Sequence, residues 1–243
     1  MMQPVPRALL VDLDDTIIAA GERPIILRQV ADELSGELGP HSPEVVAGRL
    51  EAALESFWSD PSRHRVARFG IPAARRQVAR EAFAEIGLPT DLADRYAERF
   101  SELRDTNTVC FPGAIAGLEA IRTHGVKLAL VTNGSAATQR AKVERFALAP
   151  YFDHIQIEGE VGFGKPEEAA YRHAMQALDA APHETWIVGD NLEWEVAAPQ
   201  RLGIRAIWCD GFRRGLPPNP RATPDHIVTS LEEIADLFAP PGR

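Results

Sequence analysis

The chain has 243 residues, of which 45% are hydrophobic and 25% charged, and its formal net charge is −9. These values are ordinary for a globular protein, and the length fits one large domain or a core with a smaller insertion. The acidic balance argues against a nucleic-acid partner, because nucleic-acid binding relies on Lys and Arg to neutralise phosphates.

The location of the protein is inferred from its first residues, its hydropathy and its cysteines. The sequence Met-Met-Gln-Pro-Val-Pro-Arg lacks the apolar segment of a secretory signal peptide. No apolar run approaches the roughly 18 residues that a membrane-spanning helix needs. Cys110 and Cys209 form no metal-spaced pair, and so few thiols indicate a reducing compartment. We therefore expect a cytoplasmic protein with no membrane partner, and the oligomeric state is left open.

The first predicted element is a short buried strand at residues 7–12, which runs into Asp12-Leu13-Asp14-Asp15-Thr16. Ligands of open α/β sheets bind at the carboxyl ends of strands, so two carboxylates and a hydroxyl are expected there. Acids this close repel each other unless a cation or a shared proton offsets their charge. Mg2+ with a phosphate fits, because Mg2+ usually binds one or two carboxylates plus phosphate oxygens. Asp12 suits a nucleophile and Asp14 a general acid and base, although Asp also favours ordinary turns.

The next region, residues 22–105, has helical rather than strand periodicity. Apolar residues recur at spacings of three and four, which predicts four amphipathic helices in a small bundle. The stripes are Ile26, Val30, Leu34 and Leu38; Val46, Leu50, Leu54 and Phe57; Val78, Ala82 and Ile86; and Leu92, Tyr96, Phe100 and Leu103.

Basic residues follow the second stripe, on a segment that we expect to be a loop. Arg63, His64, Arg65 and Arg68 lie near Trp58 in the sequence. Arg68 is a candidate for binding the anionic end of a substrate, and Trp58 for stacking on a base or sugar. Arg28, on the first helix, is a further candidate. A solvated charged surface and a core aromatic remain the favoured alternatives.

After the helical region, strand-length apolar runs alternate with helical segments. This rhythm predicts βαβ units and a mainly parallel sheet with helices on both faces. The expected strands are 127–132, 154–157, 185–189, 204–209 and 226–228, and the expected helices are 114–124, 136–146, 167–178 and 193–202.

The second cluster of polar residues is Thr132-Asn133-Gly134-Ser135, directly after a predicted strand. A hydroxyl at a strand end, together with N–H groups that open the next helix, can hold phosphate oxygens. An ordinary strand-to-helix turn with Ser135 as N-cap explains the same residues.

Two further clusters complete the set. In Gly164-Lys165-Pro166-Glu167, Pro166 suits the first position of a helix, which places Lys165 on the loop before it. Lys165 there would offset the charge of Asp12 and bind a phosphoryl group, although most lysines are simply solvated. Asp190 ends the strand at 185–189 and suits a metal ligand, whereas a helix-capping turn is the alternative. Glu195 follows as an acid that could orient bound water or Lys165.

The motifs DLDDT, LVTNG, GKP and VGDNLEWE occur in that order, and the chain thereby resembles the haloacid dehalogenase superfamily, specifically its Mg2+-dependent phosphatases with a helical cap. The resemblance covers nearly the whole chain. It implies an α/β fold with a Rossmann-like core at 1–17 and 108–243 and an all-α cap at 18–107. The hinges would lie near residues 19–21 and 107–111.

The resemblance also implies a role for each matching residue. Asp12 would be the nucleophile and Asp14 the general acid and base. Mg2+ would be held by the Asp12 carboxylate, the Asp14 backbone carbonyl and the Asp190 carboxylate. The phosphoryl group would be bound by Thr132, Asn133, Gly134 and Lys165, and the supporting residues around the metal ligands would be Glu195, Thr16 and Asn191. Many members carry Asp where Glu195 stands, and Glu193 is a weaker candidate for the same role.

The predicted activity is hydrolysis of a small phosphomonoester through an aspartyl-phosphate intermediate. Asp14 points away from dehalogenation, because the dehalogenases lack an acid at that position and use no Mg2+. A phosphomutase of the same superfamily and a non-catalytic phosphate- or metal-binding protein are the alternatives. Phosphoglycolate, nucleotides and sugar phosphates all remain open as substrates, with cap closure expected to exclude bulk water.

Overall fold

The computed structural model describes residues 4–220 and 222–238, and they form two compact units. One unit comprises Met1–Ala19 with Cys110–Arg243, and the other comprises Ala20–Val109. We refer to them as the core unit and the helical unit. Within the described ranges, no helix has both the length and the apolar composition needed to cross a bilayer.

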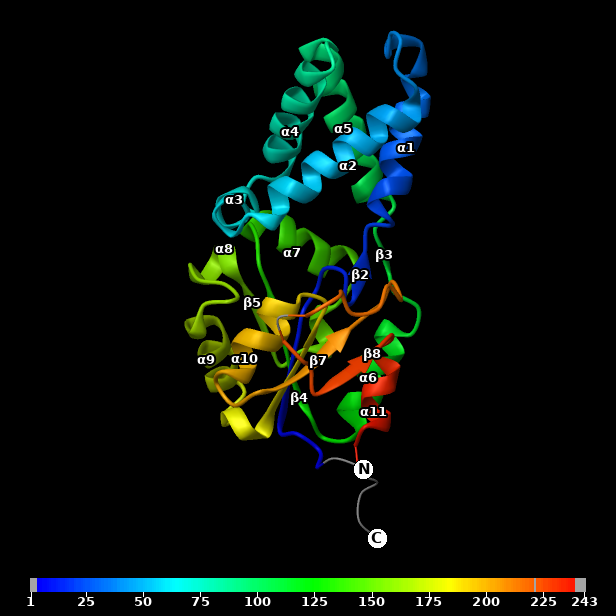
Figure 1. Cartoon of the computed structure of the whole chain (residues 1–243). Coiled ribbons are helices and arrows are strands. Elements are labelled where there is room, and N and C mark those ends of the chain that lie inside the picture. The colour runs from blue at the N-terminus through cyan, green and yellow to red at the C-terminus, as the bar shows by residue number, and fades with distance from the viewer. Residues whose placement is uncertain (1–3, 221, 239–243) are drawn as a thin grey trace. The chain divides into compact units, whose positions relative to one another are not determined.

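The core unit is built on a six-stranded sheet in the order β5-β4-β1-β6-β7-β8. Figure 1 labels β4, β5, β7 and β8 of this sheet. Every strand pair in this sheet is parallel. The strands are β1 (Ala8–Val11), β4 (Lys127–Thr132), β5 (His154–Ile157), β6 (Thr185–Gly189), β7 (Arg205–Cys209) and β8 (His226–Val228). On one side of β1 the next strands are β4 and then β5. On its other side the next strands are β6, β7 and β8. The order therefore reverses around β1, which is where α/β sheets bind ligands.

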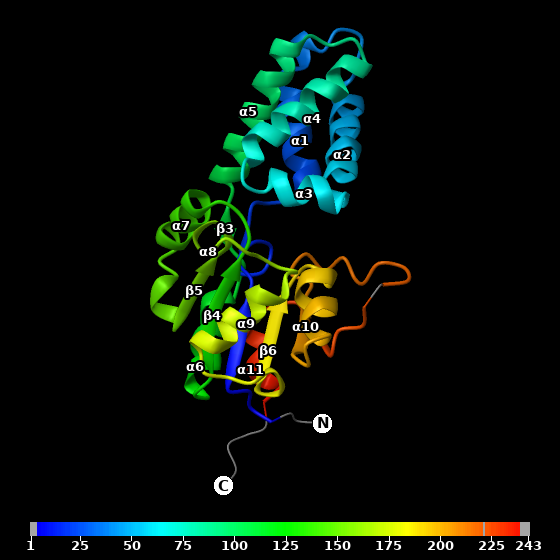
Figure 2. The ribbon, with the colours of Figure 1, turned by 90° about the vertical axis from the view of Figure 1, so that its left-hand side faces the viewer.

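Helices cover both faces of this sheet, because alternate residues of each buried strand point to opposite sides. Leu9 and Val11 pack in one apolar cluster with residues of α6 (Ala114–Thr123), α7 (Ala136–Arg145) and α11 (Glu232–Asp236). Ala8 and Leu10 pack in another with α9 (Glu168–Ala177) and α10 (Ala198–Gln200). Figure 2 shows α9 lying across β4 and β6. The expected mainly parallel sheet with helices on both faces is confirmed.

The helical unit has its own apolar core, which includes Leu27, Leu54, Phe83 and Tyr96. The Tyr96 hydroxyl donates a hydrogen bond to the carbonyl of Leu27, so this buried polar group is satisfied. The helices are α1 (Arg23–Glu33), α2 (Pro43–Ser59), α3 (Pro61–Ala67), α4 (Ile71–Glu85) and α5 (Thr90–Thr106).

The short helix α3 corrects the sequence interpretation, which placed a loop there. The Asp60 side chain accepts hydrogen bonds from the backbone N–H groups of Ser62, at 2.8 Å, and Arg63, at 3.3 Å. Pro61 occupies the first helical position, where its missing N–H is harmless. Asp60-Pro61 is thus a helix-start signal, and the basic residues 63–65 lie on a helix.

Small elements complete the core unit and its connections. The strands β2 (Ile18–Ala19) and β3 (Val109–Cys110) form a separate two-stranded sheet. A short helix α8 (Glu158–Val161) follows β5, and a π-helix (Leu192–Ala197) replaces the first part of the helix expected at 193–202. Among the described residues, 3-10 turns lie at Ala149–Tyr151 and Pro182–Glu184 in the core unit and at Ser35–Glu37 in the helical unit.

Candidate active site

The nucleophile candidate, Asp12, lies directly beyond the central strand β1. Its backbone N–H donates to the Val188 carbonyl at 3.0 Å, which continues the pairing with β6 and fixes where the side chain begins. The residue is 8% exposed. The Thr16 hydroxyl contacts Asp12 Oδ2 at 3.3 Å, so Thr16 supports the carboxylate from within the same loop.

Lys165 joins two of the acids. Its Nζ lies 2.5 Å from Asp12 Oδ1 and 2.7 Å from Glu195 Oε1, and the lysine side chain is 1% exposed. The lysine expected on a loop near Asp12 is therefore a buried cation between two carboxylates. A fully solvated lysine, the alternative reading of the sequence, is excluded.

The loop carrying Lys165 is held by Asn133. The Asn133 side chain donates to the Lys165 carbonyl at 2.7 Å and accepts from the Lys165 backbone N–H at 2.9 Å. The helix begins later than expected: Pro166 follows a cis peptide bond, Glu167 is the N-cap and α9 starts at Glu168. Both polar atoms of the Asn133 amide thus hold this loop, and the expected contact of Asn133 with phosphate stays a prediction.

The second polar cluster follows β4. Thr132 is buried, and its hydroxyl accepts a hydrogen bond from Gln139 Nε2 at 2.6 Å. The Gly134 N–H, expected to face a phosphate, donates to Glu158 Oε2 at 3.0 Å. Ser135 caps α7 by accepting from the Thr138 N–H at 3.3 Å, so the ordinary capping role expected for this serine is also present.

Asp190 follows β6, the strand beside β1. Its backbone carbonyl accepts from Trp208 Nε1 at 2.6 Å, which fixes the start of the loop. Asn191 caps the π-helix, since its Oδ1 accepts from the N–H groups of Glu193, at 3.0 Å, and Trp194, at 3.1 Å. The Asn191 side-chain oxygen therefore caps this helix. The backbone N–H of Asn191 donates to Glu195 Oε2 at 2.9 Å.

The electrostatics of the site show an excess of acid. Burial raises the pKa of Asp12, against the lowering effect of Lys165. Burial also raises the pKa of Glu195 to about 7, with Lys165 again opposing. Burial lowers the pKa of Lys165, but the charges of Asp12 and Glu195 outweigh it and leave that pKa above its ordinary value.

Asp190 belongs to the same acidic group. Burial of the carboxyl, followed by the charges of Glu195, Asp12 and Asp15, raises the pKa of Asp190 well above its ordinary value. The residue nevertheless keeps exposed surface, so the charges of the neighbouring acids contribute alongside burial of the carboxyl. Several acids thus surround a single buried lysine, and a further cation would relieve their mutual repulsion.

This arrangement fits a hard divalent cation. In the described part of the chain, no three or more His, Cys, Asp or Glu side chains gather closely enough to hold a metal by themselves. Mg2+ does not need such a group, because it usually keeps several waters and binds through one or two carboxylates. The unbalanced acids Asp12 and Asp190 therefore suit Mg2+ better than a metal that requires a full set of protein ligands.

The substrate candidates of the helical unit have structural roles as well. Arg28 forms an ion pair with Asp32 at 3.0 Å, one turn along α1. The Trp58 ring packs edge-on against Phe57 and His64, each with ring centroids 5.1 Å apart. Arg68 is buried, with its guanidinium 5.9 Å from the centre of the Phe69 ring. Their proposed role in substrate binding stays a prediction.

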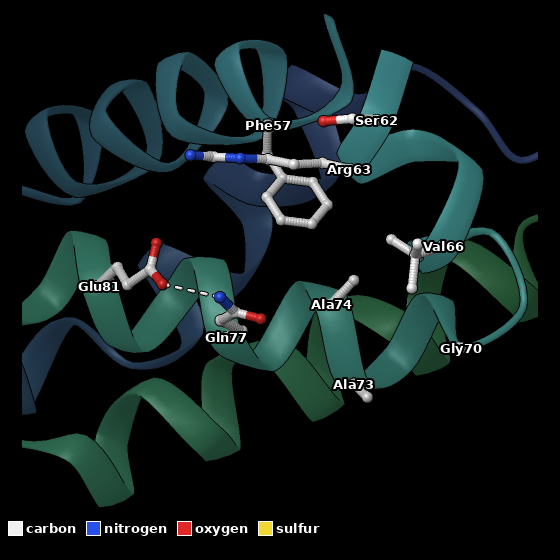
Figure 3. A pocket seen from close by; sticks show the side chains of 10 residues that line it. Phe57, Ser62, Arg63, Val66, Gly70, Ala73, Ala74, Gln77 and Glu81 are labelled. Carbon is white, nitrogen blue, oxygen red and sulfur yellow. Dashed lines mark hydrogen bonds between the residues drawn. The ribbon is translucent and has the colours of Figure 1, made fainter. Parts of the chain in front are cut away.

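The helical unit also carries an open groove of about 580 Å3 between α3 and α4 (Figure 3). Phe57 and Val66 supply apolar surface, and Gln77 is hydrogen-bonded to Glu81 on the opposite wall. None of the three substrate candidates lines this groove.

Sequence reasoning missed three residues that contact the site: Gln139, Lys142 and Glu158. Gln139 lies four residues before the buried Val143 on α7, so it is a polar residue on the buried stripe of an amphipathic helix. That pattern was a usable signal. Glu158 is buried on α8, and no spacing rule links it to Gly134, 24 residues earlier.

The chain was compared with known proteins. A model of the haloacid dehalogenase-like hydrolases matches residues 6–203. A phosphoserine phosphatase from Thermus thermophilus is 36% identical, over 94% of this chain and 97% of the relative. A phosphoglycolate phosphatase from Cupriavidus necator is 29% identical, over 96% of this chain and 93% of the relative.

Solved structures agree with this picture. The crystal structure of a HAD phosphatase from Thermococcus onnurineus superposes with a TM-score of 0.61 at 26% identity, covering 95% of this chain and 97% of that one. The sheet, the motifs at its strand ends and the matches along nearly the whole length point the same way. The chain belongs to the haloacid dehalogenase-like hydrolases and is a phosphatase of that family.

Proposed function

We propose that this phosphatase hydrolyses a small phosphomonoester with Mg2+, through an aspartyl-phosphate formed on Asp12. The contact between Lys165 Nζ and Asp12 Oδ1, at 2.5 Å inside a buried acidic cluster, is the observation that carries the proposal. A buried lysine beside a carboxylate at the end of the central strand supplies positive charge where an anionic phosphoryl group would meet an anionic nucleophile.

The reaction has two steps. An Asp12 carboxylate oxygen attacks phosphorus, the bond from phosphorus to the alcohol oxygen breaks, and Asp14 gives that oxygen a proton. A water molecule then attacks phosphorus and gives a proton to Asp14. The bond from phosphorus to the Asp12 oxygen breaks, which releases phosphate and restores both carboxyl groups.

The other residues position the phosphoryl group and offset its negative charge. Lys165 would bind the transferring phosphoryl group together with the Thr132 hydroxyl and backbone N–H groups of the loop after β4. Mg2+ would be held by the carboxylates of Asp12 and Asp190 and the Asp14 carbonyl. When bound, it would supply the positive charge that lets two anions approach.

Three relatives that align along nearly the whole chain support a narrower substrate class. Their names indicate phosphoserine, phosphoglycolate and glyceraldehyde 3-phosphate. All three are small phosphate esters, and the first two also carry a carboxylate. We therefore favour an ester of this size over nucleotides and larger sugar phosphates. The helical unit, at residues 20–109, remains our candidate for selecting among such esters.

The test measures phosphate release from a panel containing phosphoserine, phosphoglycolate, nucleoside monophosphates and hexose phosphates. We expect turnover of the small carboxylated esters, loss of turnover with a chelator and recovery with added Mg2+. Asp12→Asn should lower kcat by at least about 10^4-fold, because the nucleophile is lost. Asp179→Asn is the matched control, since this aspartate is exposed and forms an ion pair with Arg7 at the surface of the core unit.

Two results would contradict the proposal. The first is an Asp12→Asn variant that retains activity above one-hundredth of the parent value while the control is unchanged. The second is isomerisation of a hexose phosphate without phosphate release, which would assign a mutase instead.

A further inference from the structure

Helix α7 contacts the proposed acid and base from both sides of its carboxyl group. Lys142 Nζ lies 2.6 Å from Asp14 Oδ1, and Gln139 Nε2 lies 2.8 Å from Asp14 Oδ2. Each carboxylate oxygen is thus held by a different side chain of the same helix. Gln139 is 125 positions and Lys142 is 128 positions away from Asp14 in the sequence.

Gln139 also joins Asp14 to the phosphate-site hydroxyl. Its Nε2 donates to Thr132 Oγ1 at 2.6 Å as well as to Asp14, and the residue is 2% exposed. An amide nitrogen has two hydrogens, so one group can serve both acceptors. The opposite amide orientation would place an oxygen against the carboxylate, which fixes the assignment.

The helix that carries these groups is itself anchored to the site. Ser135 caps α7 three residues after Thr132, and the Gln139 N–H donates to the Ser135 carbonyl at 3.1 Å. The Asp14 side chain, in contrast, is 47% exposed and lies on a loop. Its direction is therefore set from α7 rather than by its own packing.

From these contacts we propose that Gln139 and Lys142 are positioning residues that hold the Asp14 carboxyl where it can exchange a proton with the leaving oxygen. The inference rests on the proposed function, in which Asp14 is the general acid. A general acid must lie within hydrogen-bond reach of the oxygen that it protonates. Misplacement by about 1 Å can cost on the order of 100-fold in rate.

The dependence of activity on the leaving group distinguishes a positioning role from a purely structural one. Loss of a purely structural contact would not change this dependence. Departure of p-nitrophenolate needs little protonation, whereas an alkoxide such as that of phosphoserine needs a proton from Asp14. The measured quantity is the ratio of kcat/KM for p-nitrophenyl phosphate to kcat/KM for phosphoserine. Because kcat/KM reports steps up to the first irreversible one, it isolates the first phosphoryl transfer.

We expect Asp14→Asn to raise this ratio by roughly 100-fold or more and Gln139→Met by about 10-fold or more, following the usual contribution of general acids. Gln139→Met also loses the contact with Thr132. That loss should lower kcat/KM for both substrates equally and leave their ratio unchanged. Gln156→Met is the matched control, because Gln156 is a buried glutamine that donates to the Ala170 carbonyl at 3.0 Å. Its variant should leave the ratio within about 3-fold of the parent.

Lys142 gives an independent variant if Gln139→Met does not fold, since the Lys142 side chain is 22% exposed. Lys142→Met should raise the ratio, and Lys142→Arg, which keeps the charge, should restore it. The inference is overturned if Asp14→Asn raises the ratio while Gln139→Met and Lys142→Met change it no more than Gln156→Met. If Asp14→Asn itself leaves the ratio unchanged, the acid role of Asp14 fails, and the inference fails with it.

Discussion

Glu195 contacts Lys165 at 2.7 Å from one side while Asp12 contacts it from the other, so one lysine neutralises two buried acids only in part. Burial raises the pKa of Glu195 from 4.5 to about 7, although Lys165 opposes the change. Between those two values the folded protein keeps a proton that the unfolded chain has released. The Glu195 contribution to stability is therefore present at low pH and is lost as the pH rises through this range.

This sign gives a measurable expectation for Glu195→Gln. In the presence of a chelator, the free energy of unfolding of the parent minus that of Glu195→Gln should fall as the pH rises from 4.5 to 7. The fall should be roughly 1 to 3 kcal/mol, from about 1.4 kcal/mol per pKa unit. Urea unfolding at several pH values measures it. A difference that stays level, or that grows with pH, would contradict the assignment.

At the scale of elements, the sequence located the strands and their terminal polar residues well. The strands at 127–132, 154–157, 185–189 and 226–228 have the expected bounds, because short buried parallel strands appear as uninterrupted apolar runs. Residues at the strand ends could then be placed at one sheet edge. Adjacency in the sequence was enough for Asp12, Thr132 and Asp190.

Two of the missed residues depend on contacts between segments far apart in the sequence. Gln139 and Lys142 reach Asp14 across more than a hundred residues. The π-helix at Leu192–Ala197 differs from an ordinary helix only by its hydrogen bonding, and no periodicity rule separates the two over one turn. The cis bond before Pro166 is equally invisible in a Lys-Pro pair.

Gly189 links an element to the site, because it ends β6 where Glu195 comes closest. A Cβ at this position would lie 2.1 Å from Glu195 Cγ. We expect Gly189→Ala to destabilise the protein by about 1 to 3 kcal/mol and to lower activity, since Glu195 must move away from Lys165.

Gly48→Ala is the comparison, because a Cβ there meets nothing within 4 Å and the residue lies inside α2. That variant should be about 0.5 to 1 kcal/mol more stable than the parent, with unchanged activity. Urea unfolding and phosphate release measure both variants. Equal stability of the two variants would show that β6 tolerates a side chain next to Glu195.

At the scale of the molecule, each unit has an apolar core of its own. The helical unit packs around residues such as Leu54 and Phe83, and the core unit packs on both faces of its sheet. All residues proposed to hold Mg2+ belong to the core unit. A ligand stabilises the structure that binds it, by about 2.7 kcal/mol at 100 times its Kd.

Calorimetry should therefore resolve two unfolding transitions, and Mg2+ should raise the midpoint temperature of only one of them. Leu54→Ala opens a cavity in the helical unit. It should therefore lower the midpoint temperature of the other transition, which Mg2+ leaves unchanged. Leu130→Ala should lower the Mg2+-sensitive transition in the same way. Each cavity should cost about 2 to 5 kcal/mol. A single transition that Mg2+ and both variants shift alike would mean that the units unfold together.

The pairing of β2 with β3 has a consequence for how such proteins can be rebuilt. The Phe111 N–H donates to the Ile17 carbonyl at 2.9 Å, so the chain leaves and re-enters the core unit at neighbouring points. Adjacent strands lie about 4.8 Å apart, a gap that a short turn closes. We therefore expect residues 20–109, which form one compact unit, to be replaceable as a single segment. A helical segment from another phosphatase could be spliced onto the same two strands, with the catalytic loops left as they are.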